Sequence, residues 1–157
     1  MDVDLKNPEV AFARGANYKL PPRVITKEEI IDFAAEFDPA FFHLDEEAAK
    51  SSLLGGLSAS GFHTCALLMK MICDRYLLES TSQGAPEVES IKWMEPVRPG
   101  DILSGESTVL DGRRSVSRPN LWVCKLHHKL TNQSGKQELE MIVIGLMAMP
   151  EVSHEQV

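Results

Sequence analysis

The spacing of apolar residues changes along the chain, from helical periodicity to strand-like alternation. After Thr26, apolar residues recur at helical spacing as far as Phe37, which predicts an amphipathic helix. Thr26 and Glu29 form a capping box, in which the hydroxyl and the carboxylate are each expected to cover an orphan amide. This helix is expected to end near Asp38, because Pro39 disfavours helical geometry in the residue before it.

A second helical segment, from Gly61 to Leu78, is apolar on nearly all sides. Only Lys70, Asp74 and Arg75 break its middle, and it contains no helix breaker. We therefore predict one helix of about 27 Å, at 1.5 Å per residue. A helix with this pattern must be enclosed rather than lie on a surface.

Alternating apolar and polar positions dominate the rest of the chain. We predict strands over residues 87–95, 102–110, 121–131 and 137–149. The last of these is nearly all apolar in its second half, so it is expected to be buried on both faces. Asp111-Gly112 is a strong hairpin dipeptide. Pro21-Pro22 restricts residues 18–25 to an edge strand or an extended lead-in.

Helices followed by consecutive strands with short turns indicate an α+β protein with an antiparallel sheet. The long buried helix suggests that this sheet curls around it. A length of 157 residues fits a single domain over residues 1–157. Residues 1–14 show no clear period and are expected to form a loose arm or a segment that packs late.

Composition excludes several classes of function. The formal net charge of −7 argues against a protein that wraps nucleic acid or binds anionic membranes. The longest apolar stretch, residues 141–149, is far shorter than the roughly 20 residues of a membrane helix. The three cysteines lack the spacing of a disulfide framework or a structural zinc site, so no metal is expected. The acidic N-terminus lacks the apolar run of a signal peptide, so the protein is expected to be cytoplasmic.

Two short segments could carry chemistry. Asp38 and His43 flank a non-helical turn, where a carboxylate and an imidazole can hold one water and move protons at neutral pH. The alternative is that Asp38 merely ends one helix and His43 caps the next, a short helix over residues 45–50 with Asp45 at its N-cap. Ser60-Gly61 opens the long helix, whose free amides could face a developing negative charge, although Ser60 could equally be a plain cap.

One basic cluster stands out on an acidic chain. It comprises Arg113, Arg114 and Arg118, to which Lys92 and Arg98 could add. Such a cluster could meet a phosphate group, and it could equally be the solvated end of a hairpin.

These features, in this order, resemble the MaoC-like acyl dehydratases, a hotdog-fold family that includes the (R)-specific enoyl-CoA hydratases. The resemblance runs from about Val24 to Pro150. It rests on the segment from Asp38 to Asp45, on Ser58-Ala59-Ser60-Gly61, and on the segment from Trp93 to Asp101.

The resemblance implies a hydratase or dehydratase that acts on a 2-enoyl or 3-hydroxyacyl thioester. Asp38 would be the general base, with His43 as its partner, and Gly61 and Ser60 would bind the thioester carbonyl. The acyl pocket would have Phe41, Phe42, Leu53 and Leu54 as walls. Coenzyme A would be part of the substrate, its phosphates being candidates for the basic cluster, and no separate cofactor would be needed. Family members pair, so a homodimer or a higher homo-oligomer is expected.

The chain departs from the family pattern at two places. Ala40-Phe41 stands where the (R)-hydratases usually have Asn-Pro, which removes an asparagine that would support the active loop. Ser60 stands where those enzymes often have histidine. Two other functions stay open. A hotdog thioesterase would need a carboxylate or amide from the central helix, which offers only the distant Asp74. A non-catalytic acyl-thioester-binding or scaffold protein would have no need of both Asp38 and His43.

Overall fold

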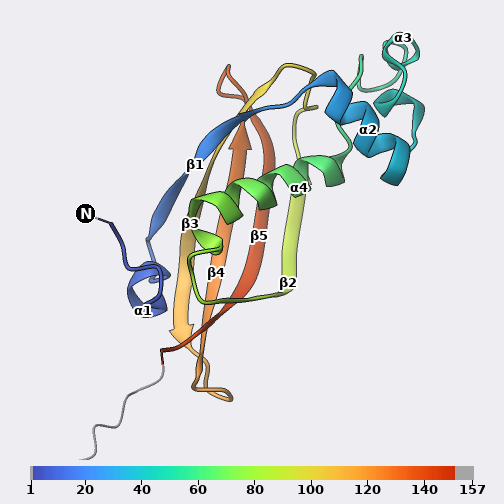
Figure 1. Cartoon of the computed structure of the whole chain (residues 1–157). Coiled ribbons are helices and arrows are strands. Elements are labelled where there is room, and N and C mark those ends of the chain that lie inside the picture. The colour runs from blue at the N-terminus through green and yellow to red at the C-terminus, as the bar shows by residue number, and fades with distance from the viewer. Residues whose placement is uncertain (1, 151–157) are drawn as a thin grey trace, which may run out of the picture.

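Residues 2–150 are described by a computed structural model, in which five strands form one antiparallel sheet of order β1-β3-β4-β5-β2. The long helix α4 lies across one face of this curved sheet, and the edge strands β1 and β2 lie on either side of it (Figure 1). The elements are α1 (Pro8–Ala11), β1 (Asn17–Val24), α2 (Lys27–Phe37), η1 (Phe41–His43), α3 (Glu46–Ala49), α4 (Gly61–Ile72), η2 (Cys73–Leu77), β2 (Ser82–Trp93), β3 (Ile102–Arg114), β4 (Leu121–Thr131) and β5 (Gln137–Ala148). The predicted α+β architecture, an antiparallel sheet around a central helix, is confirmed.

The predicted helix caps form, with one difference. Thr26 Oγ1 accepts a hydrogen bond from Glu29 N–H at 3.2 Å, as predicted. The carboxylate of Glu29 instead lies 3.5 Å from Arg23 Nη2, so its side chain is engaged outside the capping box. Asp45 accepts two backbone N–H groups from the first turn of α3, both at 3.0 Å, which confirms it as the N-cap.

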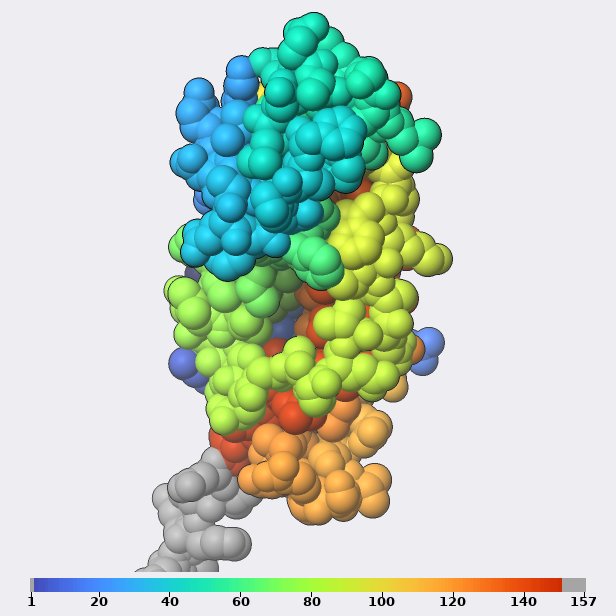
Figure 2. All heavy atoms as spheres, turned by 90° about the vertical axis from the view of Figure 1, so that its right-hand side faces the viewer, coloured from blue at the N-terminus to red at the C-terminus, as the bar shows by residue number. Residues whose placement is uncertain are grey.

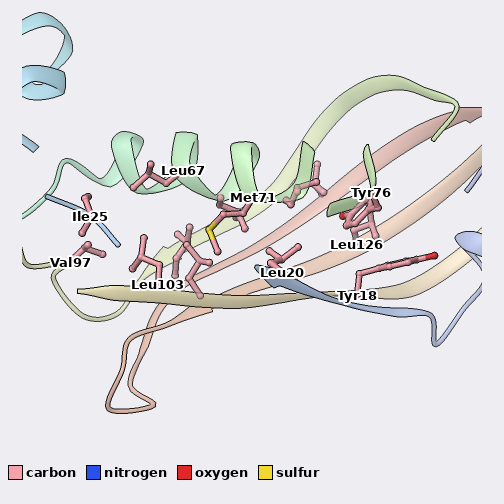
Figure 3. Packing of buried hydrophobic residues seen from close by; sticks show 14 of the residues in the cluster. Tyr18, Leu20, Ile25, Leu67, Met71, Tyr76, Val97, Leu103 and Leu126 are labelled. Atoms are coloured by element: carbon pink, nitrogen blue, oxygen red, sulfur yellow. The ribbon is translucent and has the colours of Figure 1, made fainter. Parts of the chain in front are cut away.

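The central helix is covered on one side only. Its inner face, including Leu67 and Met71, packs on sheet residues such as Leu103 (Figure 3). Its outer face leaves Phe62 68% exposed and Met69 46% exposed. The prediction of a fully enclosed helix is therefore wrong for a single chain, because the sheet passes along one face of α4. The helix also ends in a wider π-helical turn, η2, rather than continuing as a regular α-helix.

Part of the segment expected to be a loose arm or to pack late is packed into the fold, whereas residues 2–4 are exposed. We call residues 8–12 the N-terminal plug. Phe12 is fully buried, with its ring centroid 6.1 Å from that of Tyr18 and 5.8 Å from that of Tyr76. Tyr18 Oη donates to the carbonyl oxygen of Ala11 at 2.6 Å, and Trp122 Nε1 donates to that of Phe12 at 3.0 Å. The plug covers the core beside η2, at the end of α4 remote from its N-terminus.

The expected hairpin at Asp111-Gly112 is wrong, because β3 runs through both residues and ends at Arg114. Gly112 serves close packing rather than a turn. A Cβ atom there would lie 2.3 Å from the carbonyl oxygen of Phe12 and 3.0 Å from the Trp122 ring. The chain therefore reverses only after Arg114, between β3 and β4.

Burial along the outer strands also differs from expectation. β5 buries Leu139, Val143 and Met147 on its inner face, whereas Ile142 and Ile144 on the other face are only half-buried. Burial of β5 on both faces is therefore wrong, since no second layer covers the outer face of the sheet within residues 2–150. β2 begins five residues earlier than predicted, because an edge strand paired only with β5 tolerates Pro86. In the described part of the chain, no helix is both long and apolar enough to cross a bilayer.

Candidate active site

A cavity of about 390 Å³ opens beside the N-terminus of α4. Its walls come from the turn after α2, from η1, from the first turn of α4 and from the connection between β2 and β3. Asp38 and His43 lie in it together with apolar side chains that include Phe42, Leu54 and Trp93. The surface is also hollowed between α4 and β2, with β5 visible at the floor (Figure 2).

The structure brings Asp38 and His43 together. His43 is buried, and its Nδ1–H donates to the carbonyl oxygen of Ser58 at 2.6 Å. That bond assigns the proton of the neutral ring to Nδ1 and leaves Nε2 available. Nε2 lies 3.4 Å from Asp38 Oδ2. The interpretation of both residues as mere helix ends is therefore too narrow, because a carboxylate and an imidazole nitrogen face each other in a cavity.

Ser60 contacts the same carboxylate. Its Oγ donates to Asp38 Oδ2 at 2.7 Å, and the residue is fully buried. Ser60 occupies the N-cap position of α4, yet its side chain makes no capping hydrogen bond. The alternative of a plain serine cap is therefore wrong. Within residues 2–150 no side chain caps the first turn of α4, and its N–H groups carry the positive end of the helix dipole.

The ring of Trp93, which the sequence did not indicate as a site residue, packs directly on Gly61. A Cβ atom at Gly61 would lie 2.7 Å from two atoms of the Trp93 ring. Trp93 Nε1 donates to the carbonyl oxygen of Gly61 at 2.9 Å, and Phe62 packs edge-on against the same ring. Trp93 lies near the end of the strand predicted over residues 87–95. No local signal in the sequence indicates that its ring lies over the start of α4.

Half of the predicted pocket wall is in place. Phe42 and Leu54 line the cavity. Phe41 is 52% exposed and Leu53 is fully exposed, and neither lines the cavity within one chain. Phe41 and Phe42 are successive residues of the short helix η1, which directs their rings differently, and only that of Phe42 turns inward.

Arg98 has a structural task. Its guanidinium donates to the carbonyl oxygens of Leu54 and Leu57, and its backbone N–H donates to Asp101 Oδ2 at 2.9 Å. Arg98 thereby holds the loop between α3 and α4, and those donors are not free for a phosphate. Lys92 is exposed next to Trp93 on β2.

The remaining arginines do not reach the cavity of their own chain. Arg113, Arg114 and Arg118 lie at the turn between β3 and β4, at the opposite end of the sheet from α2 (Figure 1). β3 has 13 residues, so about 40 Å separates its two ends. Arg114 is paired with Glu9 of the plug at 2.9 Å. Within one chain, these three arginines therefore lie far from the cavity.

Two buried titratable groups flank the site. The carboxyl of Glu138 is fully buried and has no hydrogen-bond partner among the described residues, and burial together with the nearby Asp101 raises its pKa to about 8. His63 stacks on Phe33 of α2 at 4.5 Å between ring centroids, and burial lowers its pKa. Among the described residues, no cluster of three His, Cys, Asp or Glu side chains could hold a metal ion.

Comparison with known proteins places these observations in a family. Residues 10–127 match the family model described as the MaoC like domain. A solved MaoC-like dehydratase from Rhodospirillum rubrum is 35% identical, with a TM-score of 0.82 over 89% of this chain and 95% of that chain.

Two further relatives are more distant or less fully covered. The uncharacterised protein YdeM of Bacillus subtilis is 32% identical over 100 residues, which are 64% of this chain and 71% of YdeM. An unliganded (R)-hydratase from Pseudomonas aeruginosa is 23% identical, with a TM-score of 0.70 over 92% of this chain and 88% of that chain, a likeness of fold alone. The predicted hotdog fold is confirmed.

Proposed function

Since this chain belongs to the family of MaoC-like dehydratase domains, we propose that it adds water to a 2-enoyl thioester, or removes water from a 3-hydroxyacyl thioester. The family and the dehydratase from Rhodospirillum rubrum support hydratase or dehydratase chemistry as the reaction class. The observation that carries the proposal is the facing pair of Asp38 and His43 beside the uncapped start of α4.

In the hydration direction, Asp38 takes a proton from the water whose oxygen attacks C3. The electron pair of the double bond moves toward the thioester, whose carbonyl oxygen gains negative charge. That oxygen faces the backbone N–H groups at Gly61, where the helix dipole and uncapped donors stabilise it. The Asp38–His43 pair then supplies a proton to C2, so one water is added in full. Dehydration follows the same steps in reverse, and side chains and water suffice without a separate cofactor.

We test the activity with crotonyl-CoA and with longer and branched 2-enoyl-CoAs, by the loss of enoyl-thioester absorbance. Asp38→Asn and His43→Gln should each lower turnover by about 100-fold or more, because each removes a proton-transfer group. Both should still unfold cooperatively, so that turnover is compared between folded proteins. Glu36→Gln is the matched control, since it removes an exposed carboxylate two residues before Asp38 and should retain full activity.

Other outcomes would replace the proposal. Full activity in both site variants would refute the mechanism. Release of free thiol would indicate the thioesterase, although Asp74 is exposed and paired with Lys70 at 2.7 Å. Tight binding of acyl-CoAs without turnover would indicate the binding or scaffold protein.

We propose coenzyme A as the carrier and a homodimer as the smallest assembly. A net charge of −7 disfavours an acidic carrier protein. Two exposed features support pairing with a second copy: the edge strand β2, and the outer face of α4 with Phe62 and Met69. Light scattering coupled to size-exclusion chromatography should give at least twice the mass of one chain. A monomer would contradict this assembly.

A further inference from the structure

We propose that Ser60 is a positioning residue, which fixes the Asp38 carboxylate and at the same time leaves the first amides of α4 free for the substrate. This inference rests on the proposed hydratase function and assigns a task within the same site. It replaces the expectation that the Ser60 hydroxyl itself binds the thioester.

The direction of the hydroxyl is the first argument. A carboxylate can only accept hydrogen bonds, so at 2.7 Å the single proton of Ser60 Oγ is committed to Asp38 Oδ2. That proton is then not available to a thioester carbonyl. Because Ser60 is fully buried, the hydroxyl also has no access to bulk water as an alternative partner.

The Asp38 carboxylate depends on Ser60 for its position. Asp38 ends α2, where its backbone N–H bonds to the carbonyl oxygen of Ala34, and its side chain is 36% exposed. The contact with His43 Nε2, at 3.4 Å, is longer than a good hydrogen bond, so Ser60 makes the shorter contact. Ala40 and Phe41, which follow in the turn, offer no polar side chain to the carboxylate. Without Ser60, the carboxylate is free to turn toward solvent and away from the reacting water.

The third argument concerns the amides of α4. A serine at an N-cap normally covers the N–H of the second or third helical residue. Ser60 has extended backbone torsions (φ −53°, ψ 139°) but no capping bond from its side chain. The rotamer of the Ser60 side chain therefore has two effects. It orients the Asp38 carboxylate, and it leaves the N–H groups of α4 uncovered where the thioester oxygen gains charge.

The test is a double-mutant cycle in kinetics. Ser60→Ala should lower kcat by roughly 10- to 100-fold, the range for losing a hydrogen bond to a charged group, with little change in KM. Ser60→Thr keeps the hydroxyl and should restore most of the activity. Ser60→Ala combined with Asp38→Asn should be no slower than Asp38→Asn alone, because Ser60 acts through Asp38. Multiplied losses in the double variant would overturn the proposal, since they would mean that Ser60 contacts the substrate directly.

A second cycle reads the same contact without activity. Urea unfolding of the wild type, Ser60→Ala, Asp38→Ala and their double variant should show coupling between positions 60 and 38, because alanine, unlike asparagine, removes the oxygen that accepts the Ser60 hydroxyl. Ser80→Ala is the matched control, because it removes a buried serine hydroxyl, bonded to Leu77 O at 2.7 Å beyond η2, and should leave kcat unchanged. Absence of coupling would refute the positioning role. A wild-type protein that hydrates no enoyl thioester would refute the proposed function and the catalytic part of this inference, even if the coupling were found.

Discussion

Replacing Phe12 with alanine should destabilise the protein by about 3–5 kcal/mol, the range for deleting a buried phenylalanine ring. Phe12 is fully buried and packs against the rings of Tyr18 and Tyr76. The loss of stability should lie toward the upper end of that range, since two aromatic pairs disappear and the backbone around residue 12 is held tightly. The carbonyl oxygen of Phe12 sits so close to Gly112 that the vacated space cannot collapse easily.

The assay is urea unfolding followed by circular dichroism, at one fixed protomer concentration because assembly adds to apparent stability. For a domain of this length, the thermal midpoint should fall by roughly 10 °C. Val10→Ala is the matched control: Val10 lies in the same short helix but is 58% exposed, so its loss should cost less than about 0.5 kcal/mol.

Measurements of kcat should distinguish a loss of stability from a loss of catalysis in Phe12→Ala. The N-terminal plug packs beside η2, and Asp38 and His43 lie at the other end of α4, so Phe12→Ala should keep its kcat at temperatures where it is folded. A loss of stability below about 1 kcal/mol would refute this argument. It would mean that the segment is attached as loosely as its lack of periodicity indicates.

Three further outcomes follow from single residues. Gly61→Ala should displace the Trp93 ring, shift tryptophan fluorescence and cost about 1 kcal/mol for the lost indole hydrogen bond; an unchanged spectrum would contradict the predicted clash. Gly112→Ala should lower the unfolding free energy by about 1–3 kcal/mol in thermal melts, because the new methyl group meets a backbone oxygen that cannot move aside. The pKa of Glu138 is raised to about 8, so the folded protein keeps a proton that the unfolded chain releases near 4.5. Stability should therefore fall as pH rises between these values, and Glu138→Gln should flatten the fall in urea unfolding at about pH 5 and about pH 8; an equally steep fall would refute the assignment.

Elements set by local signals could be predicted from the sequence. Thr26 and Asp45 cap helices because a hydroxyl or carboxylate at that position reaches amides two or three residues away. β4 follows the predicted residues 121–131, because strict alternation and flanking turns leave one assignment. In both cases the deciding interactions lie within the segment or at its ends.

Elements that depend on contacts between distant parts of the chain could not be predicted from the sequence. Gly112 follows an aspartate, as hairpin glycines often do, yet it does not adopt a positive φ. What it accommodates is the carbonyl oxygen of Phe12, 100 positions earlier in the chain, and the ring of Trp122. Sequence shows that a glycine is present, and does not show whether it is needed for backbone torsion or for space.

The residues of the candidate site differ in the same way between local and distant contacts. Asp38 and His43 lie in one short turn, so their spacing allowed the hypothesis that they meet, although it left open that each only ends a helix. The bond from Ser60 joins residues 22 positions apart and depends on the choice of one rotamer over a cap. Trp93 depends on how the end of β2 meets the start of α4, which only the assembled fold determines.

The outer face of α4 shows why a wrong structural prediction can still be informative. The pattern required enclosure on all sides, and one chain provides a single sheet on a single side. Phe62, Met69 and the half-buried Cys65 and Cys73 stand at helical spacing along the uncovered face. A stripe of this kind, next to an unpaired β2 edge, carries a free-energy cost in water that a second copy of the chain would remove. The apolar pattern of α4 therefore fits the proposed assembly better than it fits one protomer, and a second copy on this face would lie beside the cavity that holds Asp38.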